Sequence, residues 1–393
     1  MKSARKFVLI SCGLLVGLIG FASALRWLQP RHEITGSLVM AAGSGSGSGA
    51  VSRALNTGDA SGFARVTEPR QLAFPADHGS HPDYQTEWWY YTGNLRSADG
   101  RRWGYQLTFF RRGLVASSPQ RASKWATRDV HFAHFAVTDG AGKQFFATAQ
   151  AARGGEIGLA GATADPYRVF VNDWEASGSG DNVHLRAVAD SASIDLRLQA
   201  AKPLTLQGDR GYSPKSTGVG NATYYYSFTR MKTSGTIVVG GSPISVEGLS
   251  WFDHEWGTNP LGPQQKGWDW FGIHLEDDRD LMIGQIRRED GGADIIGSIT
   301  GVDSKAPQYY LKDVRLTTLD TWTSPRTGIQ YPSHWRLEIP AAKLDLTIQP
   351  LIPDQELDVG LVYWEGAVEV RGDVTGQGYV ELTGYGTSPP IAH

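Results

Sequence analysis

Cysteine is almost absent from this chain of 393 residues, and the single residue, Cys12, lies in an N-terminal leader. The rest of the chain can therefore form no internal disulfide, so its stability has to come from a buried core, which a chain of this length can supply. Blocks of like charge are also absent, and the net charge is only −3. This balance gives no basis for binding nucleic acid or an anionic membrane surface.

Helical periodicity is the second absence, because no window of 12 or more residues has apolar positions at i, i+3, i+4 and i+7. The chain instead has short segments of strand composition between turns that contain Gly, Asp or Pro. These segments are 103–110, 130–138, 183–188, 194–198, 224–230, 267–275, 281–287, 314–319, 335–339, 344–348, 362–370 and 378–384. The pattern predicts an all-β protein built from sandwiches or barrels, and closure into barrels removes exposed strand edges.

Motifs for cofactors are missing as well. The chain has no Gly-x-Ser-x-Gly, no phosphate-binding glycine loop that opens a helix, and no zinc-type spacing of Cys or paired His. We therefore expect no dinucleotide or metal cofactor.

The leader has the features of an export signal. Lys2, Arg5 and Lys6 precede an uncharged run over residues 7–25, and Ala22-Ser23-Ala24 fits the small-x-small pattern of a cleavage site. The run is also about long enough to cross a bilayer. We expect residues 1–24 to be a signal peptide or an N-terminal membrane anchor, so the protein is periplasmic or anchored facing outside the cytoplasm. Lipidation at Cys12 is a weaker alternative.

Composition and a weak repeat suggest the organisation of the remaining chain. Residues 25–64 contain the Gly-Ser run 43–49 and are predicted to be a flexible linker. The sequence around Trp89 and Gly104 is echoed around Trp364 and Gly378. The echo favours two tandem domains, with an N-terminal barrel over 65–245 and a C-terminal barrel over 246–393.

The densest group of aromatic and titratable residues lies in 251–257 and 267–272. Alternate residues of a strand share a face. One face of the first segment would carry Trp251, Asp253 and Glu255, and the other Phe252, His254 and Trp256. In the second segment Trp268 and Trp270 share a face, and Asp269 opposes them. If the first of these faces lined a cavity, the cavity would contain aromatic rings and two carboxylates. If the second face lined it, the cavity would contain aromatic rings and an imidazole. The alternative is that the Trp residues form core and the acids lie at the surface.

Two further segments hold candidate ligand-binding residues. In 86–92, Glu87, Trp89 and Tyr91 would share one face. The preceding loop could hold a metal through His78, His81 and an Asp, but a polar turn that ends at Pro82 is the favoured interpretation. His131 and His134 would point to opposite faces of a regular strand, so they could not chelate a metal together. One of them could line a cavity.

Several long motifs resemble the AttH-like, carotenoid 1,2-hydratase-like family. They are 81–93, 131–139, 247–257, 267–271, 354–357 and 363–370, and the match covers roughly residues 65–385. The resemblance implies two tandem lipocalin-like antiparallel β-barrel domains that bind a hydrophobic small molecule near their junction. Its hydratase branch adds water to a terminal carbon–carbon double bond of acyclic carotenoids without a cofactor.

The resemblance also suggests catalytic residues. His254 and Trp256 match the family's His-x-Trp, and Asp269 matches a downstream aspartate, although Gly267 replaces an expected tyrosine. We expect Asp269 as proton donor, with Asp253 as substitute, and His254 as base. Trp256 and Trp270 would form an aromatic wall. The candidate ligand-binding residues are Trp251, Glu255, Trp268, Trp270, Glu87, Trp89, Tyr91, His131 and His134.

Two other classes of function stay open at this point. The protein could be a non-catalytic carrier of lipophilic molecules, or a carbohydrate-active protein, since Trp platforms and carboxylates also suit sugars. A closed apolar cavity with a few polar groups would favour the hydratase or the carrier, and an open cleft lined by Trp would favour sugar. The sequence identifies no protein partner.

Overall fold

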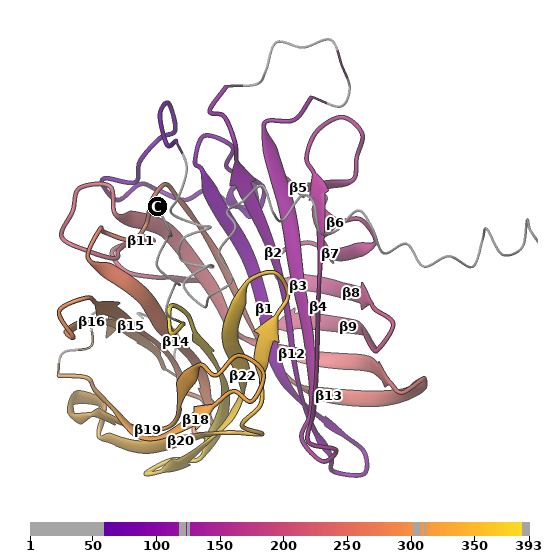
Figure 1. Ribbon diagram of the computed structural model, residues 1–393, viewed down its shortest axis with the longest axis vertical. Coiled ribbons are helices and arrows are strands. Elements are labelled where there is room, and N and C mark those ends of the chain that lie inside the picture. Colours follow the sequence, from indigo (N-terminus) through magenta and orange to yellow (C-terminus); the bar gives the residue numbers. More distant parts are fainter. Residues whose placement is uncertain are drawn as a thin grey trace, which may run out of the picture. The chain divides into compact units, whose positions relative to one another are not determined.

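The computed structural model describes residues 59–117, 123, 126–301, 308–309, 311 and 313–386. Within them the secondary structure is strand, apart from the short 3-10 helices η2 (Ala76–His78) and η3 (Pro340–Ala342), which confirms the predicted all-β class (Figure 1). Neither is long or apolar enough to span a membrane. The predicted leader and most of the predicted linker lie outside the described residues.

The first sheet is antiparallel and winds through most of the N-terminal half of the chain. Its neighbouring strands follow in the order β4 (Gln144–Arg153), β3 (Asp129–Asp139), β2 (Arg102–Gly113), β1 (Thr86–Ser97), β13 (Ser242–Gly257), β12 (Ala222–Val239), β9 (Ala192–Ala200), β8 (Asn182–Val188), β7 (Trp174–Gly178), β6 (Tyr167–Val171) and β5 (Ala160–Ala164). The short strands β10 (Thr205–Leu206) and β11 (Tyr212–Pro214) also pair with β12.

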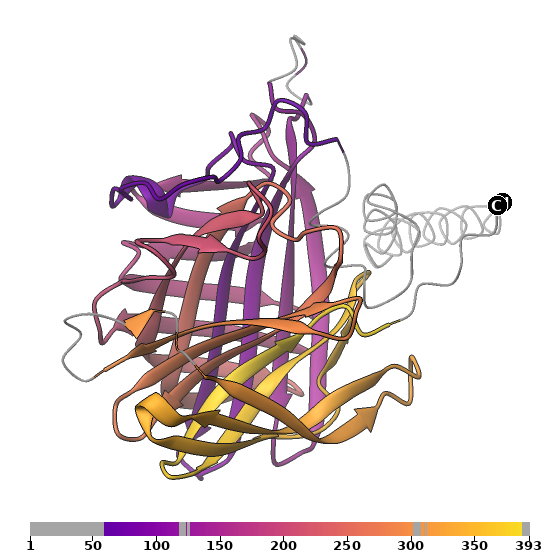
Figure 2. The ribbon, with the colours of Figure 1, turned by 90° about the vertical axis from the view of Figure 1, so that its left-hand side faces the viewer.

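The second sheet is also antiparallel and lies beside the first (Figure 2). Its order is β17 (Gln308–Tyr309), β16 (Ala293–Thr300), β15 (Asp280–Arg288), β14 (Gln265–Leu275), β23 (Gly376–Leu382), β22 (Val362–Gly372), β20 (Leu344–Pro350), β19 (Gln330–Ile339) and β18 (Arg315–Thr323). The strand β21 (Glu356–Asp358) pairs with β22.

The change from one sheet to the other falls later in the chain than the predicted boundary. β13 pairs along its length with β12, and its C-terminal part also pairs with β1, so it belongs wholly to the first sheet. The predicted boundary at residues 245 and 246 therefore falls inside β13, and the second sheet begins at Gln265. The sequence echo could not locate this point, because the long hairpin formed by β12 and β13 crosses the predicted boundary.

Each sheet curls, but to a different degree. In the first, β4 approaches the turn between β6 and β7, where the Gln150 side chain bonds to Asp173 at 3.0 Å and to Asn172 at 2.9 Å. This sheet is a nearly closed barrel and the second is a half-barrel, so the prediction of two antiparallel barrels is confirmed, with incomplete closure of the second.

Burial patterns show which strands lie between the two sheets. β9 alternates buried apolar and exposed polar residues, as expected for a strand with one face in water. In contrast, β2 and the C-terminal half of β13 are buried at nearly every position. Their second face is covered by the second sheet, mainly by β14, β22 and β23. Both faces of the Trp251–Gly257 segment are therefore inside the protein.

Polar contacts hold the two sheets together. Asp280 of β15 is buried and accepts hydrogen bonds from Lys202, which follows β9, at 2.8 Å and from Arg230 of β12 at 2.7 Å. Asn94 of β1 donates a hydrogen bond to the Gly378 carbonyl of β23 at 2.7 Å. Any other arrangement of the two sheets would leave these buried polar groups without their hydrogen-bond partners, which costs free energy. The contacts therefore favour this arrangement.

Candidate functional site

A cavity of about 80 Å³ lies between the two sheets. Its walls come from both sheets and from two loops, and their surface is mostly apolar. The lining residues are Trp88, Tyr90, Thr108, Phe110, Lys215, Tyr225, Asp253, Glu255, Pro260, Leu261, Trp268, Trp270, Met282, Gly284, Ile286, Ile296, Tyr363, Glu365 and Glu381. We call this space the junction cavity. It has room for about three water molecules, or for the end of a larger molecule.

Aromatic side chains form much of the wall. Trp270 packs edge-on against Tyr90, with ring centroids 5.1 Å apart, and against Trp251 at 5.8 Å. Its indole also donates to the Tyr225 hydroxyl at 3.2 Å. Gly272 makes this packing possible, since a Cβ there would lie 2.4 Å from the Trp270 ring. The rings are thus fixed before any ligand arrives.

A pair of glutamates, Glu365 buried and Glu381 half-buried, opens onto the cavity. Glu365 of β22 and Glu381 of β23 are direct cross-strand partners, so their side chains share a face. Burial raises the pKa of Glu381 to about 8. Burial, with the neighbouring Glu381 charge, raises the pKa of Glu365 well above its usual range. Since two carboxylates in one apolar place cannot both ionise easily, the pair retains a proton near neutral pH.

Asp253 is a third acid in the cavity wall. Burial raises the pKa of Asp253 to about 7, although three donors act in the opposite direction. The donors are the Ser227 hydroxyl at 2.5 Å, the Trp251 indole at 2.7 Å and the Tyr225 hydroxyl at 2.8 Å. All three give hydrogen bonds to the carboxyl oxygens, so Asp253 is arranged to accept protons rather than to donate them.

The opposite face of β13 points into the first barrel and carries a different cluster. Glu87 Oε1 lies 2.7 Å from His81 Nδ1 and 2.9 Å from His254 Nε2, and Glu87 Oε2 accepts from Arg111 at 2.8 Å. Although burial acts against it, the pKa of Glu87 is held well below its usual range by Arg111 and His81. Burial lowers the pKa of His254 to about 4. Trp256 stacks on His81 with centroids 3.8 Å apart.

Asp269 lies in neither place. It faces the side of β14 opposite to Trp268 and Trp270, as the alternation predicted. There its carboxylate accepts hydrogen bonds from Arg287 at 2.9 Å, from the Tyr385 hydroxyl at 2.9 Å and from Gln285 at 3.2 Å. Burial raises the pKa of Asp269 while Arg287 opposes the shift.

The four predicted catalytic residues are therefore not brought together. Asp253 lines the junction cavity, His254 and Trp256 lie inside the first barrel, and Asp269 lies in the second. Asp253 and His254 project from opposite faces of β13, and Asp269 projects from the face of β14 that is turned away from the cavity. A single site that uses Asp269 as acid, His254 as base and Trp256 with Trp270 as wall does not fit this geometry.

The predicted ligand-binding residues divide in the same way. Glu255, Trp268 and Trp270 line the cavity, and Trp251 packs behind it. Glu87, Trp89 and Tyr91 share a face, as predicted, but this face is the packed interior of the first barrel.

The two predicted histidines of β3 also occupy different places. His134 lies at the junction and contacts the Tyr363 hydroxyl at 2.8 Å, and burial lowers the pKa of His134 to about 3. His131 lies nearest Asp129, at 3.4 Å, and is not part of the cavity wall. The two do not form a common site.

Several cavity residues were not predicted from the sequence. Trp88 and Tyr90 of β1 lie directly opposite Glu255 and Asp253 of β13 in the strand register. Their side chains therefore point to the same side of the sheet as the two acids. Glu365 lies in the quoted 363–370 motif, but its pairing with Glu381 depends on the register of β22 and β23. Lys215, whose ammonium lies 2.6 Å from Glu255, comes from a loop with no distinguishing motif.

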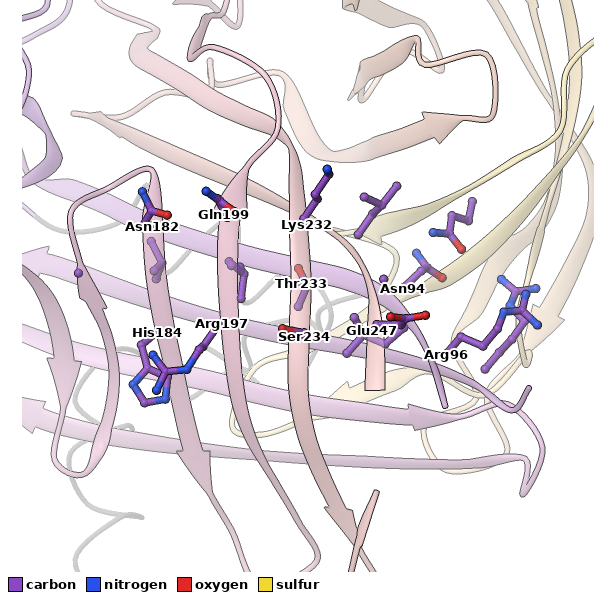
Figure 3. Close-up of a pocket in the computed structure, with 18 of the residues that line it drawn as sticks. Asn94, Arg96, Asn182, His184, Arg197, Gln199, Lys232, Thr233, Ser234 and Glu247 are labelled. Carbon is purple, nitrogen blue, oxygen red and sulfur yellow. The ribbon is translucent and has the colours of Figure 1, made fainter. Parts of the chain in front are cut away.

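A larger hollow, of about 880 Å³, lies on the face of the first sheet turned toward solvent. Figure 3 shows polar side chains from neighbouring strands along it, among them Asn182, Arg197, Gln199 and Lys232. It is open and holds no buried acid, and Arg197 and Lys232 are exposed. We assign the functional site to the junction cavity because aromatic surface and titratable groups with shifted pKa values converge there.

The fold and the cavity define a class: tandem lipocalin-like β-barrel proteins with a mostly apolar cavity at the barrel junction. Within this class, residues 65–385 match the AttH-like family model, and the chain belongs to the AttH-like family. A solved protein from Nitrosomonas europaea assigned as AttH is 35% identical, with 82% of this chain and 100% of that chain covered and a TM-score of 0.74.

A more distant solved structure shares the fold. Kievitone hydratase from Nectria haematococca is 13% identical, with 82% of this chain and 98% of that chain covered and a TM-score of 0.61. No curated protein matches the chain. The predicted family and the lipocalin-like fold are thus confirmed.

Proposed function

We propose that the protein binds a neutral, largely apolar small molecule at the junction cavity and adds water to a carbon–carbon double bond of that molecule without a cofactor. The observation that carries this proposal is the Glu365–Glu381 pair, which keeps a proton near neutral pH beside aromatic rings. Membership of the AttH-like family supports the ligand class. The reaction class agrees with the name of the fold relative kievitone hydratase.

Hydration of an alkene needs a proton donor first. The protonated glutamate of the pair gives its proton to one alkene carbon, whose π electrons form the new C–H bond and leave a cation on the other carbon. The faces of Trp268 and Trp270 stabilise that cation by roughly 0.5 to 2 kcal/mol when water is excluded. A water oxygen then bonds to the cation, its surplus proton passes to Asp253, and proton return to the glutamate pair completes the cycle.

The charges at the cavity restrict the ligand. Asp253, Glu255, Glu365 and Glu381 all line it, and the ammonium of Lys215 is already bound to Glu255. An anionic group would meet carboxylates without a free cation, so we expect a neutral molecule. At about 80 Å³ the cavity takes only the reacting end. The remainder would pass the loops that carry Lys215, Pro260 and Leu261.

The test measures water addition by the purified full chain. Lycopene, an acyclic carotenoid, and kievitone serve as probes in water enriched in oxygen-18, and mass spectrometry detects the label in the product. We expect Glu381→Gln and Glu365→Gln to lower the rate by at least about 100-fold. Glu369→Gln is the matched control, because Glu369 lies on β22 but is partly exposed and pairs with Arg102. Unchanged rates in both cavity variants would overturn the acid role.

The same measurement separates the enzyme from a lipophilic-ligand carrier. For a carrier, the probes would quench the fluorescence of the cavity tryptophans, and no labelled product would form. That result would replace the hydratase proposal with a binding function at the same cavity.

We further propose that the protein is exported. The support is the leader, in which three basic residues precede 19 uncharged ones. Deletion of residues 2–24 should leave the protein in the cytoplasmic fraction of its host. A full-length chain that stays in that fraction would contradict export.

A further inference from the structure

Two histidines and a glutamate converge inside the first barrel, on the face of β13 turned away from the junction cavity. His81 Nδ1 and His254 Nε2 lie 2.7 and 2.9 Å from the same atom, Glu87 Oε1. The three ligand atoms lie within 4.8 Å of one another. Glu87 and His254 are fully buried, whereas the His81 side chain is 12% exposed. The cluster is therefore enclosed but reachable from one side.

A second partner orients each of these three side chains. His81 Nε2 lies 2.9 Å from Asp77 Oδ1, His254 Nδ1 lies 3.1 Å from the Tyr226 hydroxyl, and Glu87 Oε2 accepts from Arg111 at 2.8 Å. Metal-binding histidines almost always have their second nitrogen held in this way, and the histidine with a carboxylate behind it is the commonest form. The cluster thus has both a set of ligand atoms and an outer set that orients them.

The hydrogen-bond partners of His81 indicate what now occupies the centre. Both nitrogens of His81 face carboxylate oxygens, which only accept hydrogen bonds when ionised, so both nitrogens carry hydrogen. Orientation by Asp77 needs only the hydrogen on Nε2. The hydrogen on Nδ1 lies between His81 and Glu87, where a cation bound to both would sit.

We propose that His81, Glu87 and His254 bind one divalent transition-metal ion of the zinc type. Two imidazole nitrogens and one carboxylate oxygen form the His₂Glu donor set of zinc sites that keep a fourth position for water. Zinc bonds of about 2.0 to 2.2 Å require ligand atoms roughly 3.4 Å apart. His81 Nδ1 and His254 Nε2, now 2.7 and 2.9 Å from Glu87 Oε1, would therefore move away from it by about 0.7 and about 0.5 Å, and the ion would displace the hydrogen on His81 Nδ1.

The charges around the cluster limit which ions fit. Arg70 and Arg111 already balance Asp77 and Glu87, at 2.7 and 2.8 Å respectively. A hard ion such as calcium, which needs six to eight oxygen ligands, would find too few here, because Glu87 Oε1 is the one carboxylate oxygen that both histidines face and Arg111 already binds Oε2. The two imidazoles instead favour zinc, cobalt or nickel. This inference revises the expectation of no metal.

The experiment uses the full chain, stripped with a chelator and then equilibrated with zinc or cobalt chloride. Plasma mass spectrometry of the dialysed protein should find one zinc per chain, and cobalt should give the visible absorption of a four-coordinate site. His81→Gln and His254→Gln should lose the ion. Asp77→Asn, which changes the partner that orients His81 without removing a ligand atom, should weaken binding about 10- to 100-fold. Circular dichroism checks that each variant is folded.

His184→Gln is the control, because His184 pairs with Asp195 on the surface at 2.8 Å and lies outside the cluster. It should bind zinc like the unchanged chain. Wild-type protein without bound metal, or a stoichiometric ion retained in both cluster variants, would overturn the proposal, as would loss in His184→Gln. If His254→Gln does not fold, His81→Gln decides the test, since His81 lies at the solvent-facing edge of the cluster.

Discussion

The spaces on the two sides of β13 contain acids in opposite states of protonation. On the junction side, the pKa values of Asp253 and Glu381 are raised to about 7 and about 8 by burial. On the barrel side, Glu87 is more deeply buried than either, yet its pKa lies well below its usual range because Arg111 and His81 contact it. Partners, rather than burial alone, therefore decide which buried acid keeps its proton. The acid that contacts a cation stays ionised and stabilises the fold, and the acids that contact no cation among the described residues have raised pKa values.

The largest expected effect comes from neutralising Glu87. Glu87→Gln leaves the fully buried Arg111 without its charged partner. We expect the free energy of unfolding to fall by about 3 to 5 kcal/mol, as for other broken buried ion pairs. Urea unfolding at neutral pH measures this loss. A loss below about 1 kcal/mol would mean that Arg111 does not depend on Glu87.

Rising pH should destabilise the protein through the junction acids. Asp253 and Glu381 have ordinary pKa values of 3.8 and 4.5 and folded values of about 7 and about 8. Between these limits the folded state binds more protons than the unfolded state, so the free energy of unfolding falls as pH rises, by on the order of a few kcal/mol. Glu87 acts oppositely, and its contribution is lost only in acid.

Urea unfolding between about pH 5 and about pH 9 tests this window. The double variant with Asp253→Asn and Glu381→Gln should show a flatter pH dependence than the unchanged protein. An equally steep decline in the double variant would assign the effect to other groups.

A smaller effect is expected at Asp269. Asp269→Asn weakens the contact with Arg287, which is itself 17% exposed, and alters the bond to Tyr385. We expect a loss of about 1 to 3 kcal/mol in unfolding free energy. Water addition at the junction cavity should continue, because Asp269 faces away from it. Loss of turnover in a folded Asp269→Asn variant would restore Asp269 as the acid.

The smallest effect on stability should follow from Glu381→Gln. Glutamine has nearly the shape of the protonated glutamic acid, and no charged partner contacts Glu381 among the described residues. Below about pH 4.5, where Glu381 is protonated in both the folded and the unfolded state, we expect the free energy of unfolding to change by less than about 1 kcal/mol. Glu87→Gln, which makes the same change at the acid on the other side of β13, is the matched comparison. Equal losses at both sites would contradict the difference between the two faces of β13.

Alternation along single strands was predictable from the sequence. It correctly separated Asp253 and Glu255 from His254, and Trp268 and Trp270 from Asp269. Which face meets the cavity was not predictable, because both faces of β13 are buried.

The acid pair depends on pairing between strands. Glu365 and Glu381 meet only because β22 and β23 pair in one particular register. Asp269 was grouped with His254 by the family resemblance, whereas the sheets place them on surfaces that face apart. Such long-range pairing leaves no local signal in either segment.

Infrared spectroscopy of the carboxyl groups tests the central claim most directly. Protonated and ionised carboxyls absorb at different frequencies, so the full chain at about pH 7 can be compared with variants that lack one junction acid. We predict a band of protonated carboxyl at neutral pH that diminishes in Glu365→Gln and Glu381→Gln and weakens as the pH rises past about 8. No such band at neutral pH, or an identical band in both variants, would contradict a proton-donating glutamate pair at the junction cavity.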